Sequence, residues 1–140
     1  MISSVRKFFQ RKPLVVVIRL DGVIGAVSRF GSGGLDDSNT QKLLEKAFEF
    51  EKAKAIAIKI NSPGGSPTQS SLIASRILKL SEEKKIPVLC FCEDVAASGG
   101  YWLACAGEEI YSDINSIIGS IGVISASFGF SELISRYGIE

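Results

Sequence analysis

A serine flanked by small residues stands where a predicted strand meets a predicted helix. Residues 96–100 read Ala-Ala-Ser-Gly-Gly and follow a strand predicted at residues 87–92. The small neighbours leave the Ser98 hydroxyl uncovered and let a substrate backbone approach closely. Two glycines in a first helical turn cost roughly 1 kcal/mol each relative to alanine, so packing alone does not favour them. Ser98 is therefore either a nucleophile or a helix N-cap, a position for which serine is preferred.

A second junction has the composition of an anion-binding turn. Residues 61–67 read Asn-Ser-Pro-Gly-Gly-Ser-Pro and follow a strand predicted at residues 55–60. Consecutive glycines can adopt positive φ and turn an amide N–H outward, as an oxyanion hole requires. The alternative is a plain turn before a helix capped by Ser66 or Thr68. No Gly-Lys-Ser/Thr follows, so this is not a Walker phosphate loop.

The rest of the chain predicts elements that would hold the two junctions at one edge of a sheet. We expect further strands at residues 14–18, 109–111 and 117–124, and helices over residues 43–48, 67–80 and 131–137. Strands that alternate with helices predict an α/β protein with a mostly parallel sheet. Ligands bind at the carboxyl ends of the strands in such sheets, where both junctions fall.

The composition excludes several kinds of chemistry. The chain has 140 residues and no histidine, which removes Ser-His-Asp, Cys-His and most zinc hydrolase sites. A formal charge of +1 gives no basic field for a nucleic acid. The three cysteines are an odd number in a chain with no secretory signal, so no disulfide framework is expected. Cys90 and Cys92 share one face of a predicted strand and are interpreted as buried thiols, with no metal and no cofactor.

The first twelve residues form a basic tail before the predicted domain. They carry four cations interleaved with apolar residues and could contact an anionic membrane surface, or simply fray. The apolar run that follows is too short to span a bilayer. We expect residues 13–140 to be a single domain, and the protein to be cytoplasmic or peripherally bound to a membrane.

Three motifs together resemble one protein family. Ile-Asn-Ser-Pro-Gly-Gly at residues 60–65, Asp-Val-Ala-Ala-Ser-Gly-Gly-Tyr-Trp at 94–102 and Gly-Ser-Ile-Gly-Val at 119–123 have the order and spacing of signal peptide peptidase A. That family is the serine–lysine peptidase family S49, which shares its fold with the Clp protease subunit and crotonase. The similarity runs from about residue 13 to residue 140 and implies a Clp/crotonase-like fold with strand–turn–helix (ββα) units.

The resemblance assigns roles to residues in these motifs. It implies that Ser98 is the nucleophile and that the amides of Gly65 and Gly99 hold the tetrahedral oxyanion. Loss of one such donor typically costs about 3 kcal/mol in the barrier. The segment at 119–123 is similar to one near the family's substrate groove. Ser120 within it is a second candidate nucleophile, or a small residue in a tight turn.

The chain departs from the family pattern in its general base. The family lysine follows the third motif in a region these residues do not reach, and Lys59 and Lys79 match no such position. A lysine base needs a pKa lowered from about 10.4 towards 7 by desolvation, whereas Lys84 and Lys85 lie in a charged run and should be solvated. We therefore expect residues 13–140 to be truncated before the base, or a second chain to supply it.

The expected function is that of a serine endopeptidase of the Ser/Lys type. It would degrade cleaved signal peptides or other hydrophobic peptides through an acyl-enzyme at Ser98, as a homo-oligomer, with the substrate adding as a strand. One alternative is an inactive, truncated subunit that oligomerises or binds peptides without the base. Another is a crotonase-like acyl-CoA enzyme, although such a site needs no serine in this motif and no acidic residue is clearly placed as its base.

Overall fold

The structure, a computed structural model, describes residues 13–25, 34–124 and 129–138. The basic tail at residues 1–12, with its expected membrane contact, lies outside the described residues. In chain order the elements are β1 (Leu14–Asp21), α2 (Asp37–Phe48), β2 (Ala53–Ser62), α3 (Pro67–Lys84), β3 (Val88–Ala97), α4 (Gly99–Ala104), β4 (Glu109–Ser112), β5 (Ile117–Gly119) and α5 (Ser131–Arg136). Within the described residues, no helix is both long and apolar enough to cross a bilayer.

The strands form one parallel sheet. Its order is β1-β2-β3-β4, and β5 pairs with β3 beyond the point where β4 ends. In register, Ile18 of β1 lies beside Ile58 of β2, which lies beside Cys90 of β3. The alternation of helices and parallel strands confirms the predicted α/β class.

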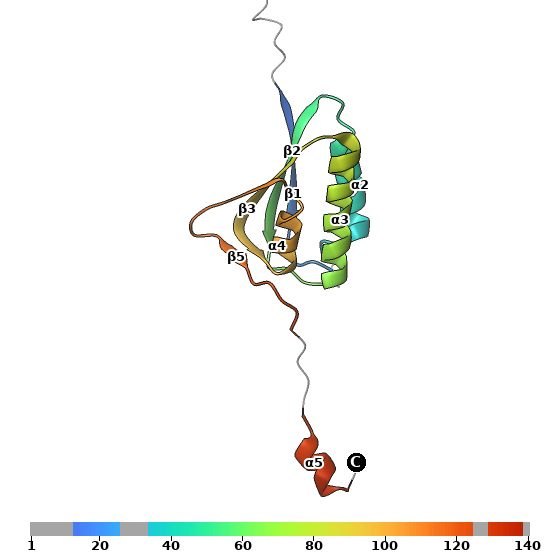
Figure 1. Ribbon diagram of the computed structural model, residues 1–140, viewed down its shortest axis with the longest axis vertical. Helices are drawn as coiled ribbons and strands as arrows, with labels where there is room; N and C mark the ends of the chain where they lie inside the picture. The colour runs from blue at the N-terminus through green and yellow to red at the C-terminus, as the bar shows by residue number, and fades with distance from the viewer. Residues whose placement is uncertain (1–12, 26–33, 125–128, 139–140) are drawn as a thin grey trace, which may run out of the picture.

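Helices α2 and α3 lie side by side along one face of the sheet, with α4 packed beside them (Figure 1). The core lies between this helical layer and the sheet. Its large members, each at most 5% exposed, are Ile18, Leu20, Ile24, Leu44, Phe48, Ile56, Ile58, Ile60, Ile73, Ile77, Val88 and Leu103. Each such side chain contributes about 1.5–3 kcal/mol on burial, so the core fixes the sheet that carries both junctions.

Local capping explains where the two long helices begin. The Asp36 side chain accepts a hydrogen bond from the Asn39 amide at 2.8 Å and caps α2. Ser66 caps α3 by accepting from the Gln69 amide, with Pro67 in the first turn. Of the two capping residues considered for this helix, Ser66 and Thr68, the structure uses Ser66.

Several strand limits differ from the sequence expectation, most of all those of β3 and β5. The third strand was expected to end at residue 92 but continues to Ala97, because Ser62 of β2 pairs with Ala96 and β5 pairs with residues 95–97. The strand expected at residues 117–124 ends at Gly119, where its partner β3 also ends. Pairing across the sheet therefore sets both limits.

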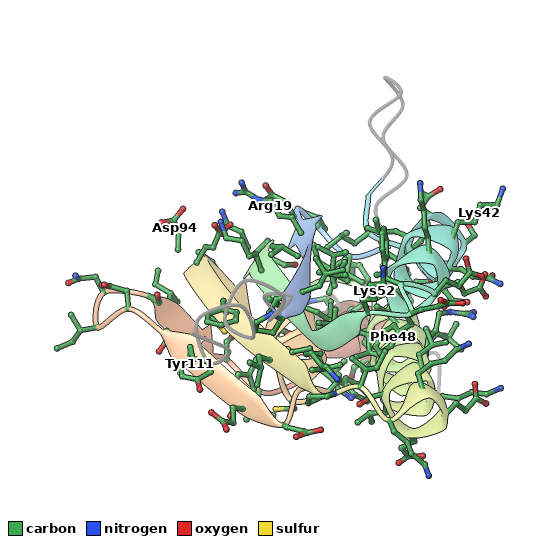
Figure 2. All side chains as sticks on the ribbon, turned by 90° about the horizontal axis from the view of Figure 1, so that it is seen from above. Arg19, Lys42, Phe48, Lys52, Asp94 and Tyr111 are labelled. Atoms are coloured by element: carbon green, nitrogen blue, oxygen red, sulfur yellow. The ribbon has the colours of Figure 1, made fainter. Side chains whose placement is uncertain are left out.

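The face of the sheet away from the helices carries an ion-pair cluster. Glu93 contacts the Lys59 ammonium at 2.5 Å and the Arg19 guanidinium at 2.8 Å, and these contacts lower the pKa of the Glu93 carboxyl, with the Lys59 hydrogen bond as the largest cause. Figure 2 shows Arg19 and Asp94 pointing outward, on the side of the molecule away from Lys42 of α2. This cluster joins three strands near their carboxyl ends.

The cysteines are free thiols, and two of them belong to the core. Cys90 and Cys92 are buried on the helix-facing side of β3, as their spacing predicted, and Cys105 is exposed at the end of α4. Burial raises the pKa of the Cys90 thiol to about 12. Cys90 is therefore a packing residue that stays protonated at neutral pH.

Candidate active site

Ser98 occupies a sharp turn between β3 and α4. Its backbone has φ 51° and ψ −116°, a left-handed φ that non-glycine residues rarely adopt. The turn is held on both sides, because the Ser98 amide donates to the Gly119 carbonyl at 2.7 Å and the Ser98 carbonyl accepts from the Trp102 amide at 3.0 Å. Such a strained strand-to-helix turn is how hydrolases present a serine oxygen.

The Ser98 hydroxyl does not cap the helix that follows it. Serine stands at the N-cap position of α4, but no side-chain capping bond is formed. Within the described residues this hydroxyl has no hydrogen-bond partner. The capping interpretation of Ser98 is therefore wrong, and its oxygen is left available to a ligand.

The second junction packs directly against the first. A β-carbon placed on Gly64 would lie 2.7 Å from the Gly99 nitrogen, 2.8 Å from the Ala97 oxygen and 2.9 Å from the Ser98 β-carbon. Gly64 also has φ +94°, a value that disfavours any side chain. Only glycine at position 64 allows the turn at residues 61–67 to contact the Ser98 turn. The segment therefore does more than precede a helix.

Two amide N–H groups beside Ser98 are free of backbone partners. Ile24 bonds to the residues on either side of Gly65, donating to the Gly64 carbonyl at 2.9 Å and accepting from the Ser66 amide at 2.8 Å. Parallel pairing of this kind points the Gly65 N–H away from Ile24. Gly99 is the first residue of α4 and so has no intrahelical acceptor. In the described part of the chain, neither amide donates a hydrogen bond.

An apolar pocket of about 330 Å³ borders this group. Its wall is formed by Gly65, Pro67, Ser98, Gly99, Tyr101, Trp102, Cys105, Ile121, Gly122 and Val123. The three site residues expected from the sequence thus line one cavity. Its remaining wall is apolar and can take up an apolar side chain beside the Ser98 hydroxyl.

Sequence reasoning missed the residues of α4 that form part of the apolar wall of the pocket. Tyr101, Trp102 and Cys105 follow Ser98 at helical spacing and therefore face the same side of α4. That spacing was visible in the sequence and could have identified them. Ile121 and Val123 reach the pocket from the segment after β5, in agreement with the resemblance of residues 119–123 to a segment near the family's substrate groove.

The other candidates lie outside this arrangement. Ser120 is exposed, has φ +53° and does not line the pocket. Lys59 is paired with Glu93 on the open face of the sheet, and Lys79 approaches Glu83 at 3.8 Å. Lys84 and Lys85 are exposed, as expected. Of the lysines in the part of the chain that the structure covers, none lines the pocket.

Comparisons with known proteins agree with the three-motif resemblance. The family model of peptidase family S49 matches residues 81–140. The chain is 37% identical over 130 residues to "Serine protease SPPA, chloroplastic" of Arabidopsis thaliana, covering 90% of this chain and 19% of that protein. It is 50% identical over 135 residues to a Brucella melitensis protein named "Na(+)/H(+) antiporter NhaA", covering 96% of this chain and 18% of that protein. The chain thus spans about a fifth of the length of these relatives.

A solved structure shows the same fold. A mutant of the 1510-N membrane-bound stomatin-specific protease superposes with a TM-score of 0.63 at 21% identity, over 91% of this chain and 60% of that one. At this identity the likeness concerns the fold, which agrees with the predicted Clp/crotonase-like architecture. The sequence matches show that the chain belongs to the signal peptide peptidase A-like proteins of peptidase family S49.

Proposed function

We propose that this chain carries the nucleophile and the oxyanion-binding amides of a serine peptidase. The Ser98 oxygen attacks the carbonyl carbon of a peptide bond, and its proton passes to a general base. The amides of Gly65 and Gly99 donate to the oxygen that becomes negative. The C–N bond then breaks, the amine leaves with a proton, and water hydrolyses the ester left on Ser98.

One observation carries the proposal. A serine with no hydrogen-bond partner in the described residues stands at a strained strand-to-helix turn, and two glycines whose amides donate no bond there line the same pocket. A purely structural serine would use its hydroxyl as a cap, and a purely structural turn would pair its amides. The uncapped hydroxyl and the unpaired amides both suit a reaction in which negative charge develops next to the serine oxygen.

The proposed substrates are hydrophobic peptides in extended form, including cleaved signal peptides. The apolar wall of Tyr101, Trp102 and Val123 supports an apolar side chain beside the bond that is cut. An extended peptide can also pair with an exposed backbone edge, here the segment at residues 120–124 that continues β5 without forming a strand. The names of the peptidase relatives support this substrate class.

The general base is proposed to be a lysine outside the described residues, either on the same polypeptide or on a neighbouring copy in a homo-oligomer. The chain has no histidine, and no lysine in the described ranges lines the pocket. The same observation favours one alternative, a subunit that binds peptides or oligomerises without hydrolysing them. The two functions share the pocket and differ only in the base.

Fluorophosphonate labelling tests the proposal. The reagent phosphonylates an activated serine oxygen, so labelling should be lost in Ser98→Ala and kept in Ser120→Ala, which removes a hydroxyl outside the pocket. Both variants should be compared with and without any residues encoded after Glu140. Faster labelling with those residues present would indicate that they supply the base. Labelling that persists in Ser98→Ala would refute the role of Ser98.

A further inference from the structure

The buried hydroxyl of Ser62 bonds to a segment that is distant in the sequence. The buried polar side chains among the described residues are Thr40, Ser62 and Ser70, and Ser62 is 0% exposed. The hydroxyls of Thr40 and Ser70 donate to carbonyls four residues earlier in the chain, those of Asp36 and Ser66. The hydroxyl of Ser62, at the end of β2, instead reaches a segment forty residues away.

Ser62 uses its hydroxyl as both donor and acceptor. Its oxygen donates to the Gly22 carbonyl at 2.6 Å and accepts from the Gly64 amide at 3.1 Å. The first bond fixes Ser62 to the turn after β1, and the second fixes the Pro63–Gly64 peptide, one peptide unit before the Gly65 N–H. Ser62 and Gly64 are buried and Gly22 is half-buried, so losing the hydroxyl would leave the buried Gly64 amide without a partner and would also remove the donor to the Gly22 carbonyl.

Ser62 also touches the first turn of α4. A β-carbon placed on Gly100 would lie 2.5 Å from the Ser62 carbonyl oxygen and 3.1 Å from the Ser62 β-carbon. In the sheet, Ser62 pairs with Ala96, two residues before Ser98. The same residue therefore contacts the loop that carries Gly65 and the turn that carries Gly99.

We propose that Ser62 is a positioning residue for the oxyanion-binding amides of this site. Its hydroxyl holds the Pro63–Gly64 peptide, which fixes the start of the next peptide, the one whose Gly65 N–H turns into the pocket, and its backbone contacts Gly100 beside Gly99. Ser62 does not line the pocket and so acts through these glycines. The catalytic consequence of this inference rests on the proposed function. The contacts of Ser62 do not depend on that function.

The binding test compares a charged tetrahedral ligand with a neutral one. A peptidyl boronic acid with an apolar side chain next to boron forms a B–O bond to a serine oxygen and places a boronate oxygen where the oxyanion develops. The same peptide ending in a carboxamide cannot form this adduct. In the full chain, Ser62→Ala should weaken boronic acid binding about 10- to 100-fold, the cost of a misplaced oxyanion donor. Carboxamide binding should change less than twofold.

A matched control separates this effect from a loss of stability. Ser81→Ala removes a hydroxyl that also donates to a backbone carbonyl in a turn, that of Ile86 at 2.9 Å, at the opposite end of β3. It should leave both affinities unchanged. Should Ser62→Ala fail to fold, Ser62→Cys keeps a weak donor and acceptor at the same position and should show a smaller loss of boronic acid affinity.

Amide NMR tests the geometry without any ligand. In Ser62→Ala, hydrogen exchange of the Gly64 amide should become at least about tenfold faster, because that amide loses its acceptor, and the Gly65 resonance should shift. In Ser81→Ala, both signals should stay as in wild type. An unchanged Gly65 resonance in Ser62→Ala, or equal weakening of the boronic acid and the carboxamide, would overturn the positioning role. Boronic acid affinity that survives in Ser98→Ala would overturn the proposed function instead, and NMR would still decide the role of Ser62.

Discussion

The contact between the two junctions can be measured with a pair of glycine substitutions. Gly64 and Gly22 have nearly the same left-handed φ, +94° and +102°. A β-carbon on Gly64 would meet three backbone or β-carbon atoms within 2.9 Å, whereas one on Gly22 would meet nothing within 4 Å. Gly64→Ala and Gly22→Ala therefore share the cost of backbone strain and differ in steric overlap.

The two variants should differ in stability by the cost of the overlap. A left-handed φ costs a non-glycine residue about 1–2 kcal/mol, which is the loss expected for Gly22→Ala. Overpacking adds about 1–3 kcal/mol, so Gly64→Ala should lose about 2–5 kcal/mol. The atoms it meets belong to residues 97–99, which cannot move without disturbing the Ser98 turn. Gly64→Ala should therefore also abolish fluorophosphonate labelling.

Urea unfolding followed by tryptophan fluorescence measures the free energy of unfolding in both variants. The single tryptophan, Trp102, lies in α4 and lines the pocket, so it also reports on the site. Equal losses in Gly64→Ala and Gly22→Ala would refute the reasoning, because they would mean that Gly64 does not touch the Ser98 turn. Normal labelling of a folded Gly64→Ala would refute it as well.

Three further predictions concern other contacts. A β-carbon on Gly99 would lie 2.2 Å from the Ser70 hydroxyl oxygen, so Ser70→Ala should recover part of the stability that Gly99→Ala loses in a double-mutant cycle measured by urea unfolding. The Arg76 guanidinium bonds both Asp37 oxygens at 2.8 and 2.7 Å and lowers the pKa of that carboxyl, so the stabilisation is present above the ordinary pKa and is lost as pH falls through the lowered one. Arg76→Met should therefore lower the free energy of unfolding by about 1 kcal/mol at pH 7 and by much less at pH 2. Iodoacetamide should alkylate the native chain at Cys105 alone, as mass spectrometry would show, and should slow fluorophosphonate labelling because Cys105 lines the pocket.

Local chemistry made much of the fold predictable. Ser66 and Pro67 start a helix through bonds and dihedral preferences within a few residues, and the structure has that cap and that helix. The isoleucines of the run at residues 55–60 are fully buried against the helices in the middle of β2, whereas Lys59 lies on the opposite, open face. The family could also be recognised from the three motifs, because their residue types, order and spacing are all visible in the sequence.

The ends of the strands were less predictable, because they depend on where neighbouring strands are available to pair. Glu93 and Asp94 have polar side chains that normally end a buried strand, yet β3 continues past them, with Glu93 held by an ion pair to Lys59. Residues 120–124 have the composition of a strand but form none, because β3 ends at Ala97 and leaves them no pairing partner. Strand formation here is decided by the neighbouring backbone and not by intrinsic preference.

The sequence by itself determined which residues could do chemistry: a serine among small residues, two pairs of glycines, and a chain without histidine. Only the tertiary structure decided that the Ser98 hydroxyl is left uncapped, that Gly64 lies against the Ser98 turn, and that Ser62 joins the two junctions. The physical reason is distance along the chain. Capping and turn preferences act over a few residues, whereas these contacts join segments some forty residues apart that meet only when β1, β2 and β3 pair side by side.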